Sequence, residues 1–245
     1  MTPFFRRIRQ KLSNENQFLK YSKYAIGEII LVVLGILIAL QINNWNNVQN
    51  DKQAEIKYLK QLLSSLEDNY QIIGDKIATN QRLYEQGVQL FKDLKQNKEL
   101  NDSIKRRFLI PQFDQAVLLN TAAFENFKND GMSLISNEEL KFEIINIYEQ
   151  ELKYMQITFA DQFENYITQV IHPFYSRNFE ITTKNEQWLA TPNDYEGLLR
   201  KREFTNILSS INSMREYAIQ FHGESQKDIK DLINKIEAEI DKLEN

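Results

Sequence analysis

The chain of 245 residues contains no cysteine, two histidines, four prolines and seven glycines. The absence of cysteine excludes disulfide scaffolds, thiolate metal sites, iron–sulfur clusters and cysteine nucleophiles. The few prolines and glycines do not suit a collagen-like, low-complexity or turn-rich all-β chain. At about 150 residues per domain, the length predicts one or two domains, and one of them could bury a sizeable core.

Motifs for catalysis and cofactor binding are also missing. His172 and His222 lack the H-x-x-x-H or E-x-x-H partner of a metal site, and two histidines cannot supply a ferritin-like di-iron pair. The sequence has no glycine-rich phosphate loop and no G-x-S-x-G nucleophile elbow. We therefore expect no enzyme activity, no catalytic or metal-ligating residue and no cofactor.

One segment is strongly apolar, in contrast to the polar remainder of the chain. Residues 24–42 read YAIGEIILVVLGILIALQI, and 19 residues of helix span about 28 Å, close to the hydrocarbon thickness of a bilayer. A cleaved signal peptide would have a shorter apolar region and an A-x-A-like cleavage site, which the end of this segment does not match. The segment predicts a permanent transmembrane helix, with Trp45 as an anchor at the far interface.

The charges on the two sides of this segment predict its orientation. Residues 1–23 carry six basic residues and Glu15, a net charge of +5, whereas the residues after Ile42 have a net charge of −8. The positive-inside rule then places the tail 1–23 in the cytoplasm and the domain 43–245 outside it. An acidic domain with Lys105-Arg106-Arg107 as a short basic patch is not expected to bind nucleic acid. The basic residues of the tail are Arg6, Arg7, Arg9, Lys11, Lys20 and Lys23.

The first residues of the tail allow two interpretations. Phe4, Phe5, Ile8 and Leu12 fall on one helical face and the basic residues occupy the rest, which suits an interfacial helix on anionic lipid headgroups. The same basic residues are equally consistent with a charged flank that only sets topology.

The strings FFRRIRQKL at 4–12, YAIGEI at 24–29 and LVVLGILIALQINNWN at 31–46 resemble a known pattern. They are similar to the N-terminal signature of an uncharacterised family of Bacteroidota membrane proteins, a domain-of-unknown-function family. The resemblance implies a single span in a bacterial inner membrane and a periplasmic helical domain. It implies no activity.

A charged residue and a stripe of small residues share one face of the predicted span. Glu28 and Gly35 are seven residues apart, and Gly35 and Ala39 form a small-xxx-small pair. Glu28 could snorkel to the headgroups or pair with Lys23, could contact a second copy of the helix, or could serve as an ion relay. The partners that we expect are the lipid bilayer, a second copy of the chain and possible other envelope proteins.

The chain after Asn50 predicts a long helix from 50 to 97, continuous with the span. Its apolar residues alternate by three and four positions, a heptad pattern typical of a coiled coil, with Asn80 and Gly87 at two core positions. The apolar positions are Ile56, Leu59, Leu63, Leu66, Tyr70, Ile73, Ile77, Tyr84, Phe91 and Leu94.

The rest of the chain predicts further helices and no strand. We expect a short helix at 114–129, then a capping box at 136–139 and a long helix that Pro173 kinks or ends. A loop at 179–190 and a C-terminal helix from Thr191 follow, with Gly223 as its expected break. The predicted class is all-α, an antiparallel bundle of four to five helices.

The aromatic residues between 159 and 179 form a dense patch whose helical spacing favours core packing over a binding pocket. The leading hypothesis is a non-enzymatic interaction or scaffold protein that self-associates. One alternative is a ligand-binding sensor that acts through a partner and uses the patch as its pocket. Another is an ion-relay or channel subunit that depends on Glu28. The patch consists of Phe159, Phe163, Tyr166, Phe174, Tyr175 and Phe179.

Overall fold

The computed structural model describes residues 18–113 and 116–245. The predicted interfacial helix, with Arg6, Arg7, Arg9 and Lys11, therefore lies outside the described residues. The chain divides into two compact units, Met1–Ala54 and Glu55–Asn245.

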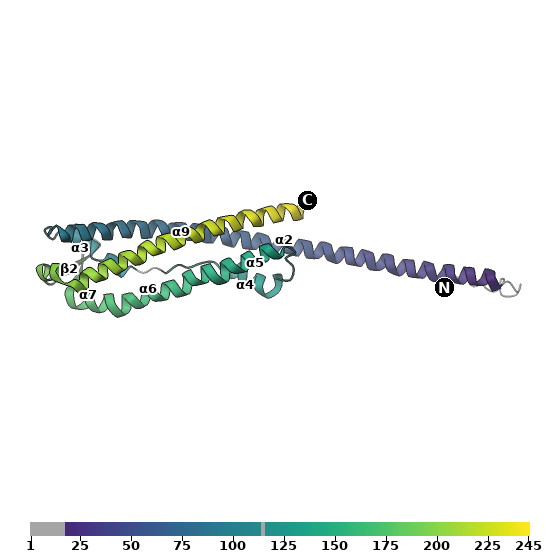
Figure 1. The fold of residues 1–245 in the computed structure, drawn as a ribbon, viewed down its shortest axis with the longest axis horizontal. Helices are drawn as coiled ribbons and strands as arrows, with labels where there is room; N and C mark the ends of the chain where they lie inside the picture. The colour runs from purple at the N-terminus through teal and green to yellow at the C-terminus, as the bar shows by residue number, and fades with distance from the viewer. Residues whose placement is uncertain (1–17, 114–115) are drawn as a thin grey trace. The chain divides into compact units, whose positions relative to one another are not determined.

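All described elements except one hairpin are helical (Figure 1), in agreement with the predicted all-α class. Element η1 is a 3₁₀ helix, and η2 to η5 are π-helical. The helices are α2 (Phe18–Lys95), α3 (Asp102–Arg107), η1 (Ile110–Gln112), α4 (Ala122–Asn126), η2 (Phe127–Gly131), α5 (Glu138–Asn146), η3 (Ile147–Leu152), η4 (Tyr154–Phe159), α6 (Ala160–Tyr166), η5 (Ile167–Ile171), α7 (His172–Asn178), α8 (Tyr195–Arg200) and α9 (Arg202–Glu244). The strands are β1 (Phe179–Lys184) and β2 (Gln187–Pro192).

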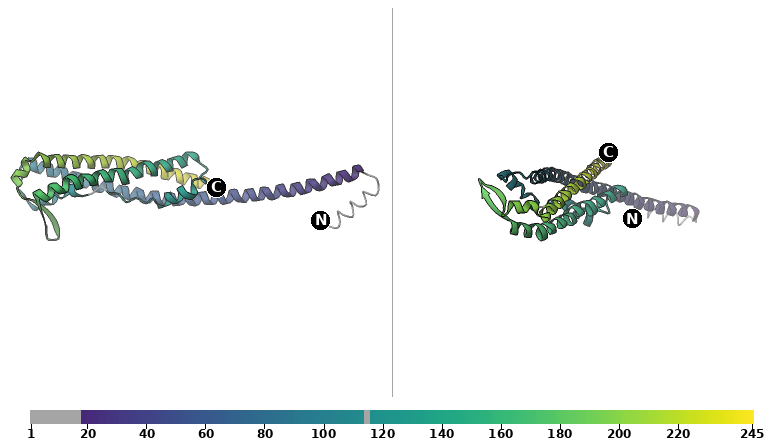
Figure 2. Two further views of the ribbon diagram at one scale, coloured as in Figure 1. Left: turned by 90° about the horizontal axis from the view of Figure 1, so that it is seen from below. Right: turned by 60° about the vertical axis from the view of Figure 1, so that its left-hand side comes forward.

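Three long helical stretches form the second unit: α2 from Glu55 onward, the run from α5 to α7, and α9. Helices α2 and α9 are antiparallel neighbours (Figure 2). Lys60 Nζ near the start of this part of α2 lies 2.7 Å from Glu244 Oε1 at the end of α9. Farther along both helices, Gln226 Nε2 donates a hydrogen bond of 3.0 Å to the carbonyl oxygen of Tyr70.

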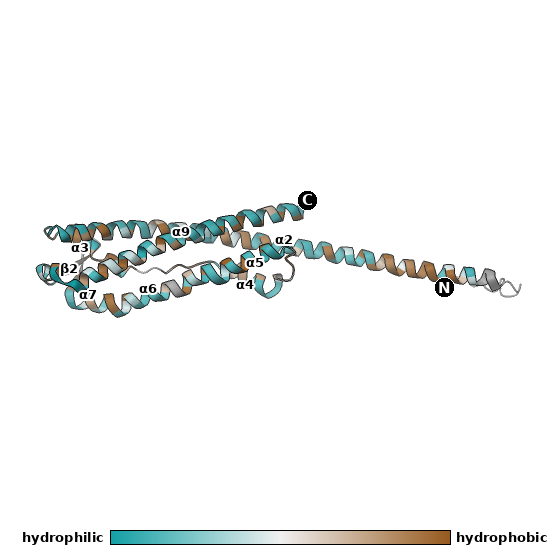
Figure 3. Ribbon diagram, viewed as in Figure 1, coloured by the Kyte–Doolittle hydropathy of each residue, from teal (hydrophilic) through white to brown (hydrophobic). Residues whose placement is uncertain are grey.

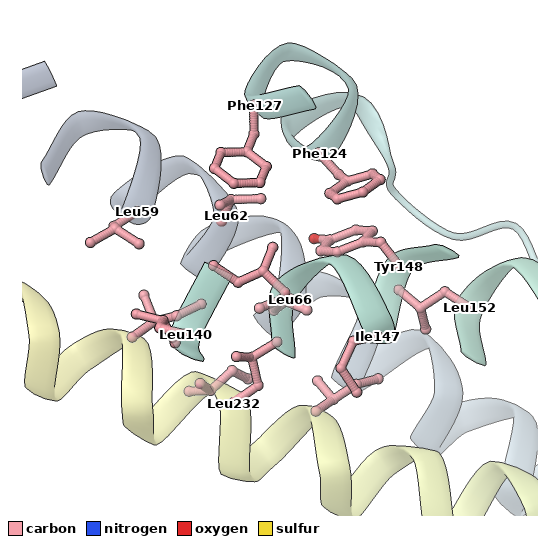
Figure 4. Packing of buried hydrophobic residues seen from close by; sticks show 14 of the residues in the cluster. Leu59, Leu62, Leu66, Phe124, Phe127, Leu140, Ile147, Tyr148, Leu152 and Leu232 are labelled. Atoms are coloured by element: carbon pink, nitrogen blue, oxygen red, sulfur yellow. The ribbon is translucent and has the colours of Figure 1, made fainter. Parts of the chain in front are cut away.

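Two clusters of buried side chains form the core of this unit. The first joins α2, the α5–η3 stretch and α9, and includes Leu66, Leu140 and Leu232 (Figure 4). In this cluster the ring of Phe124 stacks on Tyr148, with centroids 4.4 Å apart. The second cluster is rich in phenylalanine. Burial of one leucine, isoleucine or phenylalanine side chain in these clusters contributes about 1.5–3 kcal/mol of transfer free energy.

The buried face of α2 is wider than the predicted heptad seam. Ile56, Leu59, Leu66 and Ile73 are buried, as the pattern predicted. At the intervening positions the buried residues are Leu62, Asn69, Leu83 and Leu90, and the predicted Leu63, Tyr70, Tyr84 and Phe91 are only half-buried. Helix α2 packs on two partners, α9 and the α5–η3 stretch, so a broader stripe than a two-helix seam is covered.

The predicted loop at 179–190 is wrong, because these residues form the β1–β2 hairpin (Figure 2). The strands are antiparallel, with Phe179 opposite Pro192 and Lys184 opposite Gln187. Asn185 and Glu186 form the two-residue turn with φ of 48° and 61°, as a type I′ hairpin turn requires. The signal in the sequence was Ile181-Thr182-Thr183, a β-branched run two positions before Asn185.

Helix boundaries also differ from the predictions. Gly223 does not break the C-terminal helix, since α9 runs unbroken from Arg202 to Glu244 and begins later than Thr191. Pro173 does not end the helical run, since α7 follows η5 directly and continues past it to Asn178. In the predicted helix 114–129, residues 116–121 form neither helix nor strand, and α4 begins at Ala122. The cap of α5 is Asn137, whose side chain accepts a hydrogen bond of 3.1 Å from Leu140 N.

Candidate functional site

The predicted span lies in the first unit, within α2. By length and composition, this part of the described chain is apolar enough to cross a membrane, with a mean hydropathy of 2.6 over 18 residues. No residue of that window is buried in the structure, and Leu31 is 65% exposed. Figure 3 shows the hydrophobic residues along this part of the helix. An apolar surface of this length needs a cover of lipid or protein.

The residues of the predicted helix contact all belong to α2. Glu28, Gly35 and Ala39 follow one another along α2, and Trp45 comes after them with 65% of its surface exposed. Lys23 is exposed at the other end of the span. A Cβ atom added at Gly27 or Gly35 would meet no atom within 4 Å, so the small-residue stripe faces open space in the single chain.

Polar residues of α9 contact Asn80 and Gly87, the two exceptions in the predicted heptad pattern of α2. Arg215 is fully buried, and its Nη1 donates a hydrogen bond of 3.3 Å to Asn80 Oδ1. At Gly87, a Cβ atom would lie 2.2 Å from Asn212 Oδ1, so the Asn212 side chain occupies the space that the glycine leaves open. The pattern in the sequence located both positions, but it did not identify their partners.

Arg215 also holds the turn between α3 and α4. Its Nη2 donates hydrogen bonds to the carbonyl oxygens of Ile110 (2.9 Å) and Phe113 (3.2 Å), and its guanidinium lies 5.6 Å from the ring centroid of Phe163. Burial lowers its pKa to about 10. Among the described residues no carboxylate forms an ion pair with it. Sequence reasoning missed this residue, because a single arginine in a polar helix carries no pattern.

Polar side chains of α2 also bind the non-helical segment at 116–121. Asn69 and Ser65 of α2 both bond the backbone of Asn120, and the Tyr148 hydroxyl donates to Ser65 Oγ at 3.1 Å. Burial raises the pKa of Tyr148 to about 12. These bonds are structural, since the tyrosine keeps its proton at any physiological pH.

Carboxylates from two helices bind the chain just before α5. Glu55 of α2 accepts hydrogen bonds from the backbone nitrogen and hydroxyl of Ser136, at 2.7 and 2.9 Å. Glu239 of α9 accepts one of 2.7 Å from Asn137 Nδ2. Both acids therefore help to hold the start of α5 against α2 and α9.

The predicted aromatic patch is core and not a pocket. Phe163, Phe174, Tyr175 and Phe179 are all buried in the second cluster, and Phe174 stacks on Phe204 with centroids 5.6 Å apart. The Phe159 side chain lies outside the described part. This packing removes the pocket on which the sensor alternative was based.

The two histidines differ in their exposure to solvent. His222 is fully buried in α9, where burial lowers its pKa to about 4, with a smaller effect of Lys76. His172 is exposed at the start of α7. Within the described ranges, no group of three or more histidine and acidic residues could hold a metal ion.

Comparisons with known proteins identify a family and no function. Residues 28–180, more than half of the chain, match the family of unknown function DUF6090. No curated protein and no solved structure matches the chain. The match begins inside the apolar span and covers the second unit as far as the start of the hairpin. The chain therefore belongs to DUF6090, a family of unknown function.

Proposed function

We propose that this protein is a non-enzymatic membrane-anchored interaction protein that holds a helical domain at a bilayer and self-associates. The observation that supports it best is the exposed apolar stretch of α2, which no described part of the chain covers. A helix with so much exposed leucine, isoleucine and valine is stable in acyl chains and not in water.

We further propose a cytoplasmic tail and a periplasmic domain in a bacterial inner membrane. The net charges of +5 before the span and −8 after it support this orientation. The cysteine-free chain makes the test simple, because each introduced cysteine is the only thiol. In spheroplasts, a membrane-impermeant maleimide should label Ser209→Cys and should not label Ser13→Cys until the cells are broken. The reverse pattern would overturn the orientation.

Self-association is the second element of the proposal. The stripe of Gly27, Gly35 and Ala39 lets two helices approach closely, and open space surrounds both glycines in the single chain. Glu28 on the same face could then bond across the contact, where an ionisable group is better placed than against lipid.

The stripe is tested by cross-linking in native membranes. The double variant Gly35→Leu and Ala39→Leu should reduce the cross-linked dimer severalfold, because bulky side chains separate the helix backbones. The control variant Val33→Leu alters a residue about half a turn away from Gly35 and should leave the dimer unchanged. Equal cross-linking in the double variant and the control would exclude this contact.

A further inference from the structure

A cavity of about 630 Å³ lies in the second unit, between α2, the α3–η1 turn and strand β2. This volume is within the range of small-molecule sites. The floor is apolar, with Leu83, Leu109 and Ile110. Two exposed aromatic side chains belong to its wall, Phe113 (51% exposed) and Trp188 (62% exposed).

The charge of this cavity is opposite to that of the domain around it. The chain after Ile42 carries a net charge of −8, yet the described residues that line the cavity include Arg82 and Arg106 and no acid. Arg106 Nη1 donates a hydrogen bond of 2.7 Å to Gln187 Oε1, which orients its guanidinium at the junction of α3 and β2. Arg82 is exposed and forms no hydrogen bond or ion pair with any described residue.

Two further groups make the cavity favourable to an anion. Arg215 lies behind its floor and bonds the carbonyl oxygens of Ile110 and Phe113, so a third guanidinium is close to the lining. Gln112 also lines the cavity, and its Nε2 is buried without an acceptor among the described residues. An unsatisfied buried donor costs about 1–3 kcal/mol. A small rotation of the amide would present this donor to a ligand.

We propose that this cavity binds a small organic anion, a carboxylate or phosphate monoester with a flat apolar body. Arg82 and Arg106 hold the anionic group by charge-assisted hydrogen bonds, and Gln112 adds a neutral donor. The apolar body lies against Trp188 and Phe113. Thr79 and the glutamines of the lining add neutral polar groups, which do not repel an anion.

The structure also supplies the probe for a test. The chain has two tryptophans, so Trp45→Phe leaves Trp188 as the single tryptophan, in the wall of the cavity. The full-length variant in lipid nanodiscs is titrated with phenylacetate and with phenyl phosphate, and binding is followed by Trp188 emission and by calorimetry. Phenethylamine has the same ring with the opposite charge, and inorganic phosphate has the anion without the ring.

Both aromatic anions should bind saturably, and the amine and inorganic phosphate should bind at least about fivefold more weakly. The double variant Arg82→Gln and Arg106→Gln should weaken binding about tenfold or more. The matched control Arg177→Gln and Arg202→Gln makes the same change of charge at exposed positions outside the cavity and should bind as the parent does.

Three results would overturn the proposal. The first is the absence of saturable binding of either anion by both readouts. The second is equal binding of phenethylamine, which would show a site for aromatic rings without charge selection. The third is equal loss of binding in the two double variants, which would show an effect of overall charge alone. None of these results bears on membrane anchoring or self-association, so the two proposals fail separately.

Discussion

The side chain of Asn69 pairs with both backbone groups of Asn120, as a neighbouring strand would. Its Nδ2 donates to the Asn120 carbonyl oxygen at 2.9 Å, and its Oδ1 accepts from the Asn120 nitrogen at 2.7 Å. The pairing replaces the hydrogen bonds that a helix at 116–121 would have made. It holds this segment, which forms neither helix nor strand, against α2 at Asn120.

Removal of this pairing should destabilise the domain. Asn69→Leu leaves the Asn120 N–H without its acceptor, whereas the Asn120 carbonyl oxygen keeps the Ser65 hydroxyl, and we expect a cost of about 1–3 kcal/mol in the free energy of unfolding. The measurement is urea unfolding of the full chain in detergent, followed by circular dichroism. Gln71→Leu, exposed on the same helix, is the control and should change stability by less than about 0.5 kcal/mol. Equal stability of the two variants would show that the pairing contributes nothing.

Arg215 should be required for stability in spite of the cost of its burial. Arg215→Met removes the charge but leaves the Asn80 side chain and two backbone carbonyls without donors, and we expect a loss of about 3 kcal/mol or more. Arg215→Lys should also destabilise, because one ammonium group cannot reproduce the fork of the guanidinium. Denaturation of both variants tests this, and a stability of Arg215→Met equal to that of the parent would contradict it.

His222 should make stability depend on pH. Its pKa in the folded chain, about 4, is below the ordinary value of 6.5, so the unfolded chain binds the proton more readily between these values. The contribution of neutral His222 to the free energy of unfolding is therefore complete above pH 6.5. It is lost as the pH falls toward 4, and the total loss is about 3 kcal/mol. His222→Gln should remove this part of the slope, and His172→Gln should retain it. An unchanged slope in His222→Gln would refute the assignment.

Two glycines should respond in opposite ways to alanine. At Gly131, a Cβ atom would lie 2.9 Å from the Tyr58 ring, and Gly131→Ala should cost about 1–3 kcal/mol. At Gly223, in the middle of α9, a Cβ atom would meet nothing within 4 Å, so Gly223→Ala should stabilise by about 0.5–1 kcal/mol. Thermal unfolding distinguishes them, and destabilisation by Gly223→Ala would show that α9 is not regular there.

The long periodic segments were predictable because each position adds to the same signal. The apolar run at 24–42 and the spacing of Ile56, Leu59, Leu66 and Ile73 both located parts of α2. Asn80 and Gly87 stood out as exceptions within that pattern. Their partners on α9, Arg215 and Asn212, could not be found, because the pairing joins residues about 130 positions apart.

Features that depend on contacts between distant parts of the chain were not predicted from the sequence. The β1–β2 hairpin is only two strands of six residues, and its short β-branched run was outweighed by the helical pattern on both sides. The non-helical segment at 116–121 is held at Asn120 by Asn69, which lies 51 residues earlier. The cavity at Arg82, Arg106 and Trp188 joins α2, α3 and the hairpin, so its residues carry no common motif.

The claim on which the account depends is that α2 remains in the bilayer as part of the intact chain. Its most direct measurement is carbonate extraction of membranes from expressing cells, followed by the intact mass of the protein. We predict a chain of 29.1 kDa, the mass of all 245 residues, in the carbonate-washed pellet. Release of this chain into the supernatant, or a mature N-terminus just beyond Trp45, would contradict the account.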